Sequence, residues 1–130
     1  MKKKILFTTV FVLIHALCFS EENNVTVVTQ EQPALYRLYS TQNMWTFLQL
    51  ETATGRIYQI QFSINDNNRG GVVLNAENLA DGEEYIIGRF TLYPTTNMWT
   101  FILLDQITGA TWQVQWSFDA ESRFVIPIFY

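Results

Sequence analysis

Two stretches of the sequence alternate between apolar and polar side chains with a period of two. In 58–64 and 112–118 every second residue is apolar, namely Tyr58, Ile60, Phe62 and Ile64, then Trp112, Val114, Trp116 and Phe118. The residues between them are Gln59, Gln61, Ser63, Gln113, Gln115 and Ser117. This period is typical of a β-strand with one face in the core and one face toward solvent.

A third stretch, 98–105, carries apolar residues on both sides of the same period. Trp99, Phe101 and Leu103 alternate with Thr100, Ile102 and Leu104. A strand that is apolar on both faces is typical of the interior of a sheet, so we expect this strand to lie between two others.

The sequence repeats itself at a spacing of 54 residues. Asn43–Phe62 corresponds to Asn97–Trp116, and fourteen positions in and around these stretches are identical. They are Leu38/Leu92, Tyr39/Tyr93, Thr41/Thr95, Asn43/Asn97, Met44/Met98, Trp45/Trp99, Thr46/Thr100, Phe47/Phe101, Leu50/Leu104, Thr54/Thr108, Gly55/Gly109, Gln59/Gln113, Gln61/Gln115 and Ser63/Ser117. So many identities indicate a duplication.

The repeat predicts an all-β domain over 35–130, built from two antiparallel meanders of three to four strands (35–75 and 88–128). We expect strands at 35–41, 44–51, 56–64 and 72–75, then at 89–95, 98–105, 110–118 and 124–130. Pro127 favours an edge position for the last strand, and 76–79 is expected to form one helical turn. The two meanders are expected to pack as a pseudo-twofold sandwich or a small barrel.

The turn between the second and third strand of each unit has explicit chemistry. Asp105 can accept backbone N–H bonds within the turn, and Gly109 can supply the positive φ that closes it. Glu51 and Gly55 are the counterparts in the first unit. A four-residue loop pairs Glu51 with Arg56, Asp105 with Ala110, Trp99 with Trp116, Phe101 with Val114 and Leu103 with Trp112.

The first twenty residues have the pattern of a secretory signal peptide. Lys2–Lys4 precede an apolar stretch from Ile5 to Leu17, and small residues follow at Cys18 and Ser20. We expect cleavage after Ser20 or Cys18, or alternatively lipidation of Cys18, which would anchor the chain to a membrane. The expected location is the periplasm, the cell surface or the secreted fraction, with 21–34 as a tether or an edge strand.

Removal of that segment leaves five arginines against twelve acidic residues, a charge of −7, with neither His15 nor Cys18. An acidic surface repels phosphate backbones, which excludes nucleic acid as an expected partner.

Without His and Cys, the chain lacks Ser-His-Asp and Cys-His nucleophile systems, thiol redox pairs and zinc sites of the usual ligands. No cofactor or metal is predicted; calcium at 65–68 is weighed against a solvated turn, which fits better. Glu51 and Asp105 are the repeat-matched acids that could act as the carboxylate pair of a glycosidase, but both fit better as turn residues. The chain is therefore expected not to be an enzyme.

Two sets of residues are candidates for ligand binding. The tryptophans Trp45, Trp99, Trp112 and Trp116 either build the core or present a stacking row that includes Trp45 and Trp99. The glutamines Gln59, Gln61, Gln113 and Gln115, beside Thr46 and Thr100, form either a solvent-facing polar row or a surface that hydrogen-bonds a sugar or a peptide.

Two resemblances follow from the second hairpin. Its turn, Asp105-Gln-Ile-Thr-Gly109 followed by Trp112, resembles the corresponding turn of quinoprotein-type propeller blades, in local chemistry only. The pattern of Leu92–Asn97 and Leu103–Trp116 resembles a group of small exported bacterial proteins, over residues 36–64 and 88–118. That resemblance implies export and carries no catalytic residue over.

The expected function is a non-enzymatic exported binding module of the cell envelope or secreted fraction, with a glycan or a protein as ligand. The alternative is a structural subunit of a larger envelope assembly, joined through free strand edges near Pro127 or 25–28.

Overall fold

The structure is a computed structural model that describes residues 32–82 and 84–129. The predicted signal peptide, the tether up to residue 31 and the lipidation site at Cys18 lie outside these residues. The described chain is all-β, in agreement with the sequence pattern. The strands are β1 (Tyr36–Ser40), β2 (Thr46–Glu51), β3 (Ile57–Gln61), β4 (Gly70–Asn75), β5 (Phe90–Pro94), β6 (Thr100–Asp105), β7 (Thr111–Gln115) and β8 (Phe124–Ile128).

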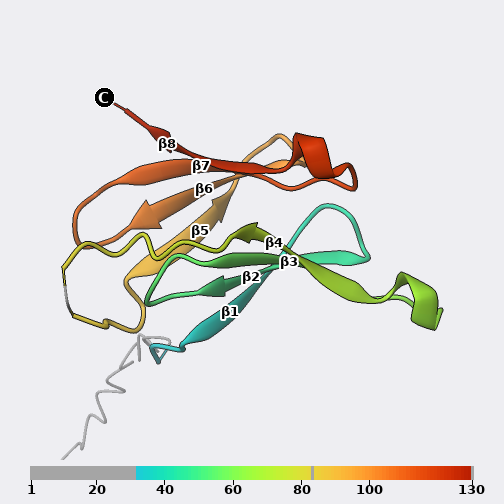
Figure 1. Cartoon of the computed structure of the whole chain (residues 1–130), viewed down its shortest axis with the longest axis horizontal. Helices are drawn as coiled ribbons and strands as arrows, with labels where there is room; N and C mark the ends of the chain where they lie inside the picture. The colour runs from blue at the N-terminus through green and yellow to red at the C-terminus, as the bar shows by residue number, and fades with distance from the viewer. Residues whose placement is uncertain (1–31, 83, 130) are drawn as a thin grey trace, which may run out of the picture. The chain divides into compact units, whose positions relative to one another are not determined.

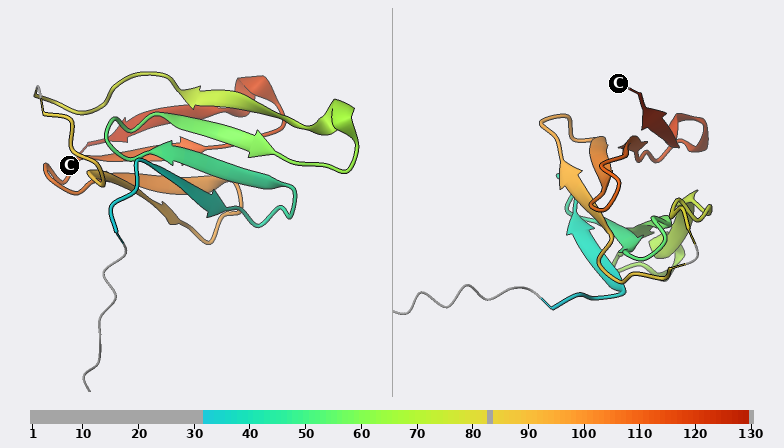
Figure 2. Two further views of the ribbon diagram at one scale, coloured as in Figure 1. Left: turned by 90° about the horizontal axis from the view of Figure 1, so that it is seen from below. Right: turned by 90° about the vertical axis from the view of Figure 1, so that its left-hand side faces the viewer.

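The strands form two antiparallel four-stranded sheets with the orders β1-β2-β3-β4 and β5-β6-β7-β8. Figure 1 and the end-on view in Figure 2 show the two sheets as two stacked layers, which is the sandwich alternative. The predicted positions of two strands are confirmed: β6 lies between β5 and β7, and β8, with Pro127, is an edge strand.

The two sheets correspond to each other at the 54-residue spacing. Each strand of the first sheet recurs in the second with the same order, and β3–β4 and β7–β8 share the register of Gln61 with Gly70 and Gln115 with Phe124. A short 3-10 turn precedes the last strand of each sheet, η1 (Asp66–Asn68) and η2 (Ala120–Ser122). Asn65 and Asp119 cap these turns by accepting a backbone N–H two residues ahead.

The hairpin pairing predicted for the second unit is confirmed. Phe101 pairs with Val114 and Leu103 with Trp112, and the Trp116 amide donates to the Trp99 carbonyl at 3.0 Å. Gly55 and Gly109 have φ of 78° and 80°, so both turns use the left-handed conformation that glycine adopts without strain.

The helical turn expected at 76–79 is wrong. The Asn75 amide donates to the carbonyls of Gly55 and Glu77, and its oxygen accepts from the Glu77 amide. Asn78 makes a similar local bond to the Ala80 amide. Such side-chain bonds compete with helical hydrogen bonds, so the segment follows an irregular path. It covers the β2–β3 turn, where the Leu79 amide donates to the Thr54 carbonyl.

The core is a single cluster to which both sheets contribute. Its buried residues are Leu48, Leu50 and Ile57 from the first sheet and Phe90, Leu92, Phe101, Leu103, Val114 and Trp116 from the second. Burial of so many large apolar side chains between the layers is what holds the sandwich together.

Candidate functional site

The two sides of each repeat are chemically different, and the strand register assigns residues to them. Neighbours along a strand point to opposite sides, and residues paired across strands share a side. We call face A the side of a repeat that carries Thr46, Leu48, Leu50, Ile57, Gln59 and Gln61, or in the second repeat Thr100, Ile102, Leu104, Thr111, Gln113 and Gln115. Face B is the opposite side, with Leu38, Trp45, Phe47, Tyr58, Ile60 and Phe62, or Leu92, Trp99, Phe101, Trp112, Val114 and Trp116.

The two repeats turn different faces toward the core. In the first sheet the buried residues Leu48, Leu50 and Ile57 belong to face A. In the second sheet the buried residues belong to face B, among them Phe101 and Trp116. The two layers therefore meet through unlike faces, and the duplication appears as a stack of two similar layers, not as a twofold that would bring like faces together.

Face B of the first repeat consequently points outward. Its exposed apolar residues are Tyr36, Leu38, Phe62 and Val73, with Trp45, Phe47, Tyr58 and Ile60 half-buried beside them. The rings of Trp45 and Phe62 pack at a tilt of 54° with their centroids 5.2 Å apart, and the Phe47 ring lies 6.1 Å from that of Phe62. In the second repeat the corresponding pair, Trp99 and Trp116, is 4.5 Å apart on the core side. The same aromatic pair is therefore presented once outward and once inward.

Face A of the second repeat is the other outward face. Tyr93, Ile126 and Ile128 are exposed there, and Ile102, Leu104, Gln113 and Gln115 are half-buried. Within the described residues, no element lies over either outward face. Each outer surface of the sandwich is thus a sheet face that exposes large apolar side chains, mixed on face A with Thr100, Thr111, Gln113 and Gln115, and exposed apolar side chains of this kind are typical of an interaction surface.

The predicted glutamine row divides between the inside and the outside. Gln59 is 4% exposed and points between the sheets, where its Oε1 accepts from the Ser117 amide at 3.3 Å. Gln61 shares this side, whereas Gln113 and Gln115 lie on the outward face A of the second repeat. The expectation of one common row is therefore wrong, because the two repeats are inverted relative to the core. Whether any of these residues binds a ligand stays a prediction.

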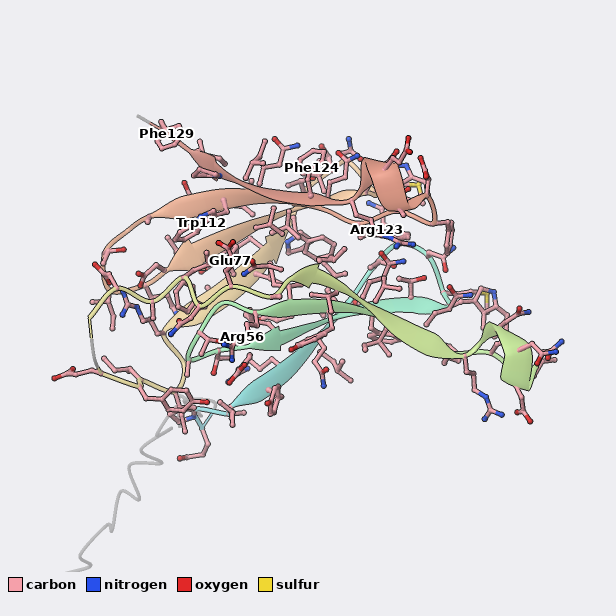
Figure 3. The ribbon with its side chains drawn as sticks, in the orientation of Figure 1. Arg56, Glu77, Trp112, Arg123, Phe124 and Phe129 are labelled. Atoms are coloured by element: carbon pink, nitrogen blue, oxygen red, sulfur yellow. The ribbon has the colours of Figure 1, made fainter. Side chains whose placement is uncertain are left out.

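The tryptophans divide in a similar way. Trp116 is fully buried and donates its indole N–H to the Met98 carbonyl at 2.9 Å. Trp99 and Trp112 pack against the core, and Figure 3 shows Trp112 on the side of its sheet that faces the first sheet. Trp45 alone of the four lies on an outward face. The alternation in 58–64 and 112–118 is the same in both copies and gives no sign of the inversion. The sequence signal that was missed is Gln49, which points outward at the position of the buried Leu103.

The turn residue Asp105 is the centre of a buried ionic network. Arg89 Nε and Nη2 donate to its two oxygens at 3.0 and 2.7 Å, and Arg89 also pairs with Asp81. Burial raises the pKa of Asp105, but hydrogen bonds from Arg89, the Thr108 hydroxyl and the amides of Ile107 and Thr108 outweigh it and lower the pKa to about 2. Asp105 is therefore an ionised structural group that closes the turn.

Glu51, the counterpart of Asp105, has different partners. It accepts from the Tyr85 hydroxyl at 2.9 Å, and Arg56 lies 3.6 Å away. Because Leu35 stands where the second repeat has Arg89, the bidentate pair is not repeated. The predicted bonds from turn amides to the carboxylate are confirmed for Asp105, which accepts from Ile107 and Thr108, whereas the contacts of the Glu51 carboxylate are with Tyr85 and Arg56. The Arg89–Asp105 pair was missed from the sequence, although a single arginine preceding a strand was a possible signal.

A polar pocket of about 330 Å³ lies at the end of the sandwich near η1 and η2. It is lined by Gln61, Arg69, Phe118 and Arg123 among others, and Arg69 and Arg123 are related by the 54-residue spacing. Arg123 donates to the carbonyls of Ser117 and Phe118, and Figure 3 shows it on the side of its sheet that faces the first sheet. The volume suits a small polar ligand.

Comparisons with protein families, curated proteins and solved structures give no match. Among the described residues, no group of three or more His, Cys, Asp or Glu side chains is placed to hold a metal ion. The same residues contain no helix with the length and apolar character needed to cross a membrane. The candidate site therefore rests on the geometry of the two outward faces and of the polar pocket.

Proposed function

We propose that this domain is a non-enzymatic, exported interaction module that binds protein through the outward faces of its two sheets. The observation that carries the proposal is the composition of those faces, which expose Leu38, Phe62 and Tyr93 in place of charged residues. Aromatic and aliphatic side chains gathered on one surface are typical of the core of a protein interface, and an exposed face of this kind is costly for a monomer to keep in water.

Export is part of the same proposal, supported by the three lysines and the apolar stretch at the N-terminus. The same two faces also support the alternative role of a structural subunit in an envelope assembly. The turn acids Asp105 and Glu51 are engaged with Arg89, Arg56 and Tyr85, which supports a structural role for them rather than a catalytic one.

Site-specific photo-crosslinking tests this proposal. A photoreactive phenylalanine analogue replaces Tyr58 on one outward face or Tyr93 on the other, in the cell that makes the protein. A matched control carries it at Ile107, which is exposed in the β6–β7 turn and lies on neither face. We expect covalent protein adducts from positions 58 and 93 and none from 107. Adducts from the control alone, or from none of the positions, contradict the proposal.

The polar pocket supports a second candidate function, the binding of a glycan that carries an acidic group. Gln61 offers amide hydrogen bonds, and Phe118 offers an aromatic wall against which a sugar ring can pack. Arg123 and Arg69 offer positive charge, with Arg69 in an ion pair with Asp66 that an acidic ligand would share. Titration calorimetry with oligouronates tests it: binding should weaken at least tenfold in Gln61→Ala and Arg69→Ala. Binding that is unaffected by both substitutions, or no binding at all, counts against this function.

A further inference from the structure

The interface inside the chain and the two outward faces are complementary to each other. Internally, face A of the first repeat packs on face B of the second. What remains outward is face B of the first repeat and face A of the second. The two faces without a partner are therefore the same two kinds of face that already fit together once within the molecule.

The residues on each outward face repeat those of the corresponding buried face. On face A, the counterparts on the inner side of the first sheet and the outer side of the second are Tyr39/Tyr93, Thr46/Thr100, Leu48/Ile102, Leu50/Leu104, Gln59/Gln113, Gln61/Gln115, Val72/Ile126 and Leu74/Ile128. On face B, the outward and buried counterparts are Tyr36/Phe90, Leu38/Leu92, Trp45/Trp99, Phe47/Phe101, Tyr58/Trp112, Ile60/Val114 and Phe62/Trp116. Size and polarity are similar at these positions. The exception on face B is Gln49, which points outward where its counterpart Leu103 is buried.

Stacked repeats need terminal layers with a polar outer side to remain soluble as single molecules. Both outer sides of this sandwich instead expose large apolar side chains, although face A of the second repeat also carries threonines and glutamines. The outward Leu38 is 62% exposed where its buried counterpart Leu92 is 2% exposed. A layer of this composition is suited to the interior of a stack, where both of its faces are covered.

We propose that copies of this chain stack head to tail, with face A of the second repeat of one copy against face B of the first repeat of the next. The proposal rests on the proposed interaction function and names a second copy of the chain as the partner. Such a contact is heterologous, so a joined pair of copies keeps one free face of each kind, and the assembly grows into a filament or closes into a ring.

One polar contact defines the register of the stack. Inside the chain, Gln59 Oε1 accepts from the Ser117 amide across the two sheets. The counterparts of these residues are Gln113 and Ser63. In the stack, the Gln113 side chain accepts from the Ser63 amide of the next copy, which orients each copy relative to the one before it.

Two charge substitutions separate this arrangement from others. Leu38→Asp blocks face B of the first repeat, and Ile126→Asp, at a position 48% exposed, blocks face A of the second. Both sites are exposed in the single molecule, so both variants should fold; Tyr93→Asp replaces Ile126→Asp if circular dichroism shows that it does not. Thr96→Asp, exposed in the β5–β6 loop, is the control with the same added charge.

The test is sedimentation velocity over a hundredfold range of concentration. The chain is expressed with its own N-terminal segment, so that any processing by the host is retained. We expect the wild type and Thr96→Asp to show a mass that increases with concentration beyond the dimer. Each face variant alone should associate at least tenfold more weakly. An equimolar mixture of the two should form a one-to-one dimer that does not grow, because one blocked face remains at each end.

Three outcomes overturn the proposal. A wild type that stays monomeric throughout the range shows that no second copy binds. Variants that each dimerise alone, with no new species on mixing, show that like faces pair. Association that survives both substitutions shows that the contact lies elsewhere. In each case protein adducts from positions 58 and 93 still support the proposed interaction function with another partner, whereas their absence removes both proposals.

Discussion

Leu38 and Leu92 occupy the same position in the two repeats, yet Leu92 lies in the core and Leu38 lies on the outer surface of the sandwich. Their strands have the same register: Leu38 lies opposite Gln49 and Leu92 lies opposite Leu103, and Gln49 and Leu103 are themselves related by the 54-residue spacing. The difference arises from which face of each repeat meets the other layer. This relationship links the fold to the proposed assembly.

The repeat provides matched variants that test which face of each sheet lies in the core. Leu92→Ala removes a buried side chain and should lower the free energy of unfolding by about 2–5 kcal/mol. Leu38→Ala changes an exposed side chain and should change it by less than about 0.5 kcal/mol. Urea unfolding measured at low concentration, where the chain is monomeric, compares the two. Equal losses at both positions contradict the assignment of the faces.

The glutamines give a second matched pair. Gln59→Ala removes a buried side chain and the acceptor of the half-buried Ser117 amide, and loss of such an acceptor should lower the free energy of unfolding by about 1 kcal/mol. Gln113→Ala, on the outward face, should cost less than about 0.5 kcal/mol in the monomer. The same urea measurements test this, and a larger loss from Gln113→Ala than from Gln59→Ala is the opposite of the expected result.

The turn glycines differ in their surroundings although they share a positive φ. An alanine at either position would have to adopt the left-handed backbone conformation, which lowers the free energy of unfolding by about 1–2 kcal/mol. At Gly55 the added Cβ also meets Leu79 at 3.2 Å and Phe90 at 3.3 Å, whereas at Gly109 it meets no atom within 4 Å. Thermal unfolding should therefore show a larger decrease in midpoint for Gly55→Ala than for Gly109→Ala. A larger effect at Gly109 argues against packing of the 76–82 segment on the first turn.

The Arg89–Asp105 pair predicts how stability depends on pH. The pKa of Asp105 is lowered from 3.8 to about 2 in the folded chain, so its stabilising contribution is complete above the unfolded pKa near 4 and is lost as pH falls toward 2. Asp105→Asn removes this titration and leaves Arg89 without its buried charged partner. This substitution should lower the free energy of unfolding by about 3–5 kcal/mol near neutral pH.

The measurement is the difference in unfolding free energy between the wild type and Asp105→Asn from pH 6 to pH 2. We expect this difference to shrink below pH 4. Glu121→Gln, at an exposed position, serves as the control for a general change in charge. A difference that stays constant down to pH 2 shows that Asp105 does not titrate in this way.

The sequence predicted the local structure well and the assembly of the layers poorly. Three predictions agree with the structure, and each uses only residues that are close together in the chain. They are the strand predicted from the alternation along 112–118, the turn at Asp105–Gly109 and the edge position of the strand with Pro127. The orientation of each sheet depends on contacts between residues far apart in the chain. Since the first repeat can bury either Leu50 or Phe47, the alternation alone does not decide which face is inside.

The Arg89–Asp105 pair was missed for a different reason. The two residues lie side by side at the open end of the β5–β6 hairpin, where Phe90 pairs with Asp105, but the repeat gives no second copy of the pair because the first repeat has Leu35 and Glu51 at these positions. The polar pocket joins Gln61 to Arg123 across the two sheets. Features that join the repeats require the arrangement of the layers, which the repeat itself does not encode.

The most direct test of head-to-tail stacking is a crosslink that its register requires. In a chain with Cys18 replaced by serine, the double variant Ser63→Cys with Gln113→Cys is treated with a short bis-maleimide at a concentration where the wild type assembles. The double variant Gln59→Cys with Ser117→Cys calibrates the chemistry, because it places the same contact inside one molecule. We expect an intramolecular crosslink in the calibrating variant and a ladder of covalent oligomers in the other. An efficient internal crosslink together with a 63/113 variant that remains entirely monomeric contradicts the stack.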